Sequence, residues 1–73
     1  MNRVDLKAAL DKLNVPSKSY SLDGDLLPDS VVLFESYNRW NVFYLDERGN
    51  RNNERHFDSE DEATGHIFDL FST

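Results

Sequence analysis

His56 lies between two carboxylates at the spacing that places side chains on one face of a β-strand. Glu54, His56 and Asp58 are each two residues apart, so all three are predicted to project from the same face. A histidine held by a carboxylate is the minimum needed for general acid or base catalysis. With 14 acidic residues and 2 histidines in the chain, however, such neighbours arise often without catalysis. Because no cysteine nucleophile, glycine-rich phosphate loop or HExxH motif accompanies them, we expect a charged strand edge rather than an enzyme.

Three aspartates surround Gly24 and resemble the oxygen ligands of a calcium loop. Asp23, Asp25 and Asp29 do not complete one, because an EF-hand needs a glutamate at its twelfth position and Phe34 stands there. The two histidines also lack any spacing typical of zinc sites. We therefore expect an aspartate-rich turn here, with no metal and no cofactor.

The charge of the chain limits its partners. Its 14 acidic and 8 basic residues give a formal net charge of −6, which repels a nucleic-acid backbone and attracts a basic protein. Exposed aromatics on a sheet can stack bases, but such platforms come with a basic groove that is missing here. The simpler explanation for the acidity is solubility. We expect a protein partner and no nucleic acid.

Length and composition indicate one small folded domain over residues 1–73. The chain is 38% hydrophobic and 12% aromatic, enough to form a core without cysteines. The first residues carry no secretory signal, and no segment approaches a membrane span. The expectation is a cytoplasmic protein that does not associate with a membrane.

Two amphipathic helices are predicted at the ends of the chain. In residues 4–13, apolar side chains recur at i, i+3, i+4 and i+7, and Asn14 and Pro16 then end the helix. The second helix starts at Ser59, the first residue of a capping box that ends at Glu62. Gly65 weakens this helix unless something packs closely against it. The predicted buried stripes are Leu6, Ala9, Leu10 and Leu13 in the first helix, and Ala63, Ile67, Leu70 and Phe71 in the second.

Residues 31–37 and 40–46 are predicted to form a β-hairpin. Both runs are rich in β-branched and aromatic residues, and Asn38-Arg39 is a two-residue gap suited to a tight turn. Pairing Tyr37 with Trp40 places Phe34 opposite Phe43 on a wholly apolar face, which we expect to be the core. The other face mixes aromatic and acidic side chains and is predicted to point outward: Glu35, Leu33, Val31, Val42, Tyr44 and Asp46, with Tyr37 and Trp40.

A third strand is predicted after a turn at Gly49, which can take a positive φ. A loop with an odd number of residues places Phe57 in the core beside Phe43. The same register sets His56 beside Tyr44 and Glu54 beside Asp46. Residues 19–22 are a candidate for a further short strand.

The predicted fold is therefore α+β: an N-terminal helix, a three- to four-stranded antiparallel sheet and a C-terminal helix, with both helices on one face of the sheet. The apolar side chains of the other face then exceed what a two-layer core needs. Either Trp40 and Tyr44 bind a partner, or the N-terminal segment or the 20–30 loop covers them as a second small core.

The stretch WNVFYLDERGNRNNERHFDSEDEA, residues 40–63, resembles small bacterial immunity proteins of polymorphic or contact-dependent toxin systems. The shared pattern is a tryptophan strand, an ERG turn and then F-x-S-E-x-E-A, with YSLDG at 20–24 resembling its upstream part. This resemblance implies a cytoplasmic protein that binds a cognate toxin domain stoichiometrically and has no chemistry of its own. Gly65, inside the final helix, is a residue that the pattern does not lead us to expect.

The expected function is thus an immunity-type inhibitor of a basic toxin domain, with aromatic anchors and opposing carboxylates on the outer face. The alternative is a small adaptor or regulatory subunit, or a homodimer, joined through an open strand edge. The predicted partner-binding residues are Glu35, Tyr37, Trp40, Tyr44, Asp46, Glu54, His56 and Asp58.

Overall fold

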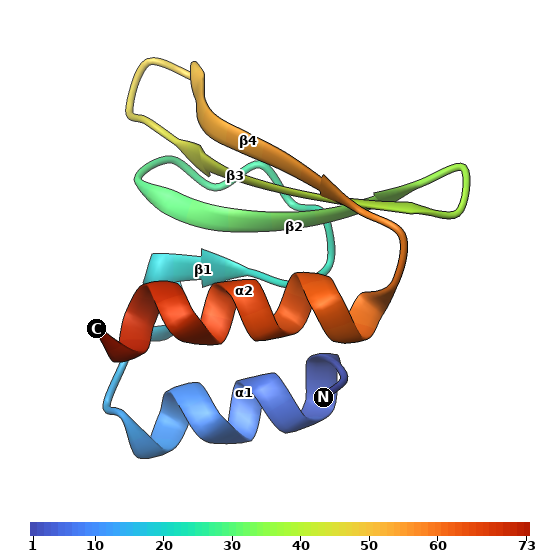
Figure 1. The fold of residues 1–73 in the computed structure, drawn as a ribbon. Helices are drawn as coiled ribbons and strands as arrows, with labels where there is room; N and C mark the ends of the chain where they lie inside the picture. Colours follow the sequence, from blue (N-terminus) through green and yellow to red (C-terminus); the bar gives the residue numbers. More distant parts are fainter.

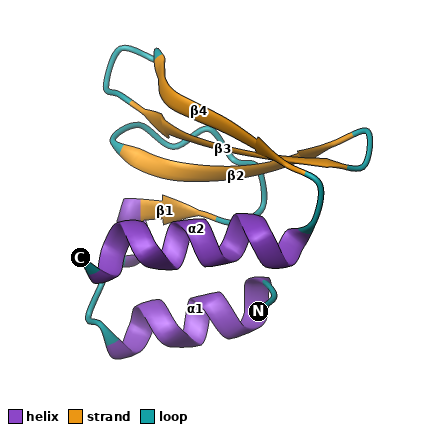
Figure 2. Ribbon diagram, in the orientation of Figure 1, coloured by secondary structure: helices purple, strands orange, loops and turns teal.

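The computed structural model describes residues 1–73 and places two helices on one side of a four-stranded sheet (Figure 1). This arrangement confirms the α+β class. Neither helix is long and apolar enough to span a membrane. The elements, shown by type in Figure 2, are α1 (Arg3–Lys12), a single 3-10 turn η1 (Ser17–Ser19), β1 (Tyr20–Ser21), β2 (Ser30–Ser36), β3 (Arg39–Leu45), β4 (Arg51–Phe57) and α2 (Glu60–Ser72).

Helix α1 begins at an asparagine cap and buries a narrow stripe. The Asn2 side chain accepts a hydrogen bond from the backbone N–H of Asp5 at 2.8 Å, which satisfies one of the free donors of the first turn. Leu6 and Leu10 are fully buried, as predicted. Leu13 is 42% exposed, so the predicted stripe was too long by this residue, which caps the helix and turns away.

Helix α2 begins at Ser59, whose side chain accepts from the backbone N–H of Glu62 at 3.2 Å. Ala63 and Ile67 are buried as predicted, whereas Leu70 is 49% exposed and does not belong to the buried stripe. A Cβ at Gly65 would meet nothing within 4 Å, so no close contact explains this glycine. The helix therefore carries the full propensity cost of a mid-helix glycine.

The sheet has the order β1-β2-β3-β4, and it is mixed rather than purely antiparallel. The antiparallel prediction was wrong for β1, which pairs with β2 in parallel through Tyr20 and Val31. The reason lies in residues 22–29, which carry the chain back so that β2 starts beside β1 and runs in the same direction. The remaining neighbours, β2 with β3 and β3 with β4, are antiparallel.

The hairpin between β2 and β3 turns at Tyr37 and Asn38, one residue earlier than predicted. Both have positive φ, 51° and 64°, as the two central residues of a type I′ turn require. Asparagine thus takes the second central position, and Glu35 rather than Tyr37 lies opposite Trp40. Because the register moved by two residues, the same side chains share each face, although their cross-strand partners differ.

A bulge in β4 sets the register of the last strand. Val42 pairs with Arg55 and Tyr44 with Asn52, so Asn53 and Glu54 both stand opposite Phe43. Asn53 takes a φ of 54° at this point. The predicted partners in β4 were therefore wrong: Phe57 lies opposite Trp40, His56 opposite Asn41, and Glu54 is not beside Asp46.

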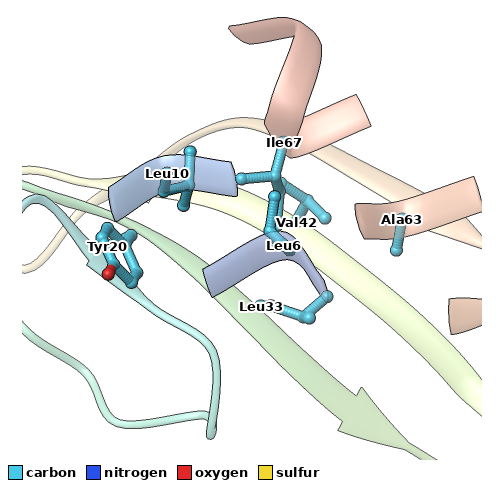
Figure 3. Packing of buried hydrophobic residues seen from close by; sticks show 7 residues of the cluster. All are labelled: Leu6, Leu10, Tyr20, Leu33, Val42, Ala63 and Ile67. Atoms are coloured by element: carbon cyan, nitrogen blue, oxygen red, sulfur yellow. The ribbon is translucent and has the colours of Figure 1, made fainter. Parts of the chain in front are cut away.

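The main core lies between the helices and the face that was predicted to point outward. Leu33 of β2 and Val42 of β3 are buried against both helices (Figure 3). That prediction was wrong because both faces of the hairpin are apolar, so alternation did not distinguish the covered face. The residues of this core are Leu6, Leu10, Tyr20, Leu33, Val42, Ala63 and Ile67.

The far face of the sheet has a small core of its own, formed by Val32, Phe43 and Leu45. Residues 22–29 help to cover it, since a Cβ at Gly24 would lie 3.2 Å from the Phe34 ring that packs against this cluster. From the sheet edge, the Arg51 guanidinium lies 4.4 Å from the centre of the Phe43 ring. Both faces of the sheet are therefore partly closed to solvent.

Candidate functional site

The predicted partner-binding residues do not form one surface. Glu35, Trp40 and Tyr44 do point to one side of the sheet, but α2 packs across that side between them. Trp40 and Tyr44 are about 13 Å apart along β3, judged from the rise of a strand. One group lies near the β2–β3 turn (Glu35, Tyr37, Trp40 and Asp58), another lies toward the β3–β4 turn (Tyr44, Asp46 and Glu54), and His56 points to the far face.

At the first of these ends, Trp40 is part of the packing of the domain. Its ring packs against the main core, and the Arg3 guanidinium lies 5.5 Å from its centre. Arg3 is itself held by Glu60 at 3.4 Å and by Asp23 at 3.9 Å. The N-terminal segment therefore covers Trp40 in part through Arg3. This agrees, for Trp40, with the interpretation in which the aromatic side chains are covered within the fold. Tyr37, at 97% exposed, stands alone on its turn.

His56 has no carboxylate partner. Its ring hydrogen-bonds to the side chain of Asn41 on the far face. The Glu54 carboxylate instead lies 3.4 Å from a guanidinium nitrogen of Arg51. Glu54 and His56 thus have different partners, Arg51 and Asn41, and not one another. The arrangement therefore offers no histidine–carboxylate pair for proton transfer.

No group of three histidine or acidic side chains is placed to hold a metal ion. Of the three aspartates near Gly24, Asp23 pairs with Arg3, and Asp29 accepts a hydrogen bond from the Tyr44 hydroxyl at 3.3 Å. These side chains serve contacts within the fold, and they do not converge on one point.

An open groove of about 520 Å³ lies between the C-terminal half of α2 and the sheet. Its walls come from three strands, β2 to β4, and from α2. We call it the Tyr44 groove. Its lining residues are Val31, Val42, Phe43 and Tyr44 from β2 and β3, residues 53–55 from β4, and His66, Leu70 and Phe71 from α2.

Tyr44 stands at the exposed end of this groove with a ring that is 40% accessible. Its hydroxyl donates to Asp29, which fixes the ring against the start of β2. Partial burial, followed by the negative charges of Asp29, Asp46 and Glu47, raises the pKa of Tyr44 above 10.0. The phenol is therefore protonated at neutral pH and sits in a negative local field.

Asp46 supplies a fixed negative charge near Tyr44. Its carboxylate accepts from the backbone N–H groups of Asn50 at 2.8 Å and Arg48 at 2.9 Å, and from the Asn52 amide at 3.3 Å. These hydrogen bonds, that from Asn50 foremost, lower the pKa of Asp46 below 3.8. Asp46 thus orders the β3–β4 turn and remains ionised well into the acid range.

His66 forms part of the opposite wall. Its ring centre lies 5.3 Å from that of Phe57. Burial, and then the positive charge of Arg55, lowers the pKa of His66 below 6.5, while Asp69 acts in the other direction. The imidazole is therefore mostly neutral at pH 7, and Arg55 is the one cationic side chain that lines the groove.

The partner-binding residues predicted from the sequence include Tyr44 and Glu54, which line the groove, but none of the residues of its α2 wall. Leu70 and Phe71 were both assigned to the buried stripe, and His66 was considered only as a metal ligand. The sequence signal for this wall was weak, because Leu70 belongs to the apolar stripe by spacing and yet is 49% exposed.

No protein-family model matches this chain, and no curated protein or solved structure matches it.

Proposed function

We propose that this protein is a small acidic protein-binding domain, without chemistry of its own, that binds and neutralises a cognate toxin of basic character. The observation that carries the proposal is the surplus of free carboxylates. Of the 14 acidic side chains, 5 lie within 4.0 Å of a cation and 9 do not. Only 5 lysine and arginine side chains are unpaired, so unpaired negative charges outnumber unpaired positive ones by 9 to 5. Such a surface attracts basic proteins and speeds their association.

Exposed aromatic and aliphatic side chains beside these carboxylates add to the support. Tyr44 and Leu70 are both accessible at the Tyr44 groove, next to Asp46 and Asp69 respectively. Aromatic anchors with a charged rim are typical of protein interfaces. A charged surface that served solubility alone would not need them.

The immunity-type function rests further on the resemblance of residues 40–63 to that family. Glu47, Arg48 and Gly49 occupy the β3–β4 turn, and residues 59–62 form the cap of α2. These are positions that shape the fold, so the resemblance supports a shared architecture more directly than a shared binding surface.

The rival function, an adaptor or homodimer joined through a sheet edge, would use β4. This strand is the long open edge of the sheet, and all its residues except Phe57 are exposed. Its bulge and its charged side chains, Arg51, Glu54 and Arg55, are features that hinder pairing with a further strand. The β4 edge therefore gives little support to an adaptor or homodimer joined through strand pairing. The acidic surface gives more support to binding of a basic toxin.

The test is capture of partners from a lysate of the source organism by the tagged protein, with the native mass of the purified chain measured alongside. We expect one basic partner in one-to-one stoichiometry, lost at high salt because the attraction is screened. Expression of that partner alone should arrest growth, and co-expression of this protein should restore it. A clean homodimer with no captured partner, or a captured partner that is harmless, would contradict the proposal.

A further inference from the structure

We infer that the Tyr44 groove is the docking site for a basic amphipathic helix of the partner. The inference rests on the proposed function, because it assumes that the partner is a basic protein. It goes further in naming the surface and the form of the bound segment, and it moves the site away from Trp40. A helix laid in an apolar groove is a common mode of recognition, with anchors at i, i+3, i+4 and i+7.

The apolar part of the groove suits such anchors. Tyr44 and Leu70 face it from opposite sides, β3 and α2, and each is 40% or more exposed. Val31 and Phe71 are half-buried in the lining and already pack against the main core. A row of apolar side chains from a partner would therefore continue the existing core and would remove Tyr44 and Leu70 from water.

The charged part of the groove selects the polar face of the bound helix. Asp29 and Asp46 flank Tyr44, and Glu47 adds to the negative field there. On the other wall, Asp69 precedes Leu70 and acts on His66. Against these carboxylates stands Arg55 alone, because His66 is mostly neutral at pH 7. Lysines and arginines on the partner helix would thus find opposite charges along both sides.

Other occupants fit less well. An anionic ligand would meet Asp29, Asp46 and Asp69 with only Arg55 to hold it. A second copy of the chain would bring further negative charge, since the molecule carries −6 overall. The Tyr44 hydroxyl, the polar group best placed to orient a small ligand, is already engaged with Asp29.

The experiment uses the full chain, labelled with ¹⁵N, and three short synthetic peptides that need no knowledge of the partner. The first carries leucine at helical spacing with lysine elsewhere. The second replaces the leucines with serine, and the third replaces the lysines with glutamate. We expect amide shifts from the Leu/Lys peptide to cluster at residues 29–31, 44–47, 53–55 and 66–71, with little effect from the other two.

Substitutions in the groove then show which side chains contribute to the affinity for the Leu/Lys peptide. Tyr44→Ala and Leu70→Ala should each weaken binding of the Leu/Lys peptide by about tenfold, as expected of interface anchors. Val4→Ala is the matched control, because Val4 is 77% exposed and lies on α1, which contributes no residue to the groove lining. Asp69→Lys should weaken binding, whereas Asp58→Lys, at the other end of the sheet, should change it far less. Circular dichroism checks that each variant folds.

Three results would overturn the inference: equal shifts from the Ser/Lys peptide, tighter binding of the Leu/Glu peptide, or shifts centred on Tyr37 and Trp40. Self-association of the chain that Leu70→Ala abolishes would also overturn it, in favour of a second copy as the occupant. The inference fails separately from the proposed function. A captured toxin that binds the Leu70→Ala variant as well as the parent would reject the groove alone, and peptide binding without any toxin partner would reject the toxin alone.

Discussion

Leu33 of β2 lies directly opposite Val42 of β3, and each is only 1% exposed beneath the two helices. This pair marks the face of the sheet that holds the main core. Leu33→Ala should lower the free energy of unfolding by about 2–5 kcal/mol, since it removes a buried side chain and leaves a cavity. Urea denaturation followed by tryptophan fluorescence measures the loss. Leu26→Ala, at an exposed loop position, is the control and should cost little; equal effects would contradict the assigned core.

Gly65 offers a stabilising substitution. A Cβ there would meet no atom within 4 Å, so Gly65→Ala adds helix propensity without a clash. We expect a gain of about 0.5–1 kcal/mol in the free energy of unfolding. The reverse change at an exposed site of α1, Ala8→Gly, should cost a similar amount. Destabilisation by Gly65→Ala would show that the glycine has a close neighbour after all.

Gly24 and Gly49 form a natural pair for separating backbone strain from packing. Their φ angles are nearly equal, 82° and 83°, but only Gly24 faces a neighbour, with the Phe34 ring 3.2 Å from the position of a Cβ. Alanine at Gly49 should cost about 1–2 kcal/mol from the left-handed backbone alone. Gly24→Ala should cost more, because the Phe34 ring must also shift. Equal costs in denaturant melts would mean that residues 22–29 do not press on the far face.

His66 should titrate below 6.5, and NMR of its ring protons measures the midpoint directly. Replacing Arg55 with glutamine should raise this pKa, since it removes a positive charge, and Asp69→Asn should lower it further. Between the folded pKa and 6.5 the unfolded chain binds more protons, so the stability from this group is complete above 6.5 and is lost as the pH falls through that window. A midpoint above 6.5 would contradict the burial of the ring in the groove wall.

Local patterns were enough to predict much of this fold. The apolar spacing around Leu6 and Leu10 and the capping box at Ser59 placed both helices, and alternation correctly sorted the hairpin residues into two faces. These signals act over a few residues, where spacing and capping chemistry decide the outcome.

The features that sequence reasoning missed depend on distant contacts. Which hairpin face is covered depends on α2 and on residues 22–29, and neither is local to the strands. The turn at Tyr37 and Asn38 puts a tyrosine at positive φ, which turn statistics disfavour but an unpacked, exposed side chain allows. No glycine marks the bulge in the sequence, since the residue with positive φ there is Asn53. The groove wall at Leu70 depends on the packing of α2 against the sheet, which the spacing of apolar residues does not encode.

Residues 22–29, which help to cover the second small core, affect how the chain responds to proteolysis. Leu26 and Leu27 are accessible in the segment that shields Val32 and Phe43. A protease that cuts between these leucines would release that shield and leave β-branched and aromatic strand surface exposed, which is the kind of surface that aggregates. Residues 22–29 therefore protect this strand surface as well as connecting β1 to β2, and shortening them to a minimal connection would uncover it.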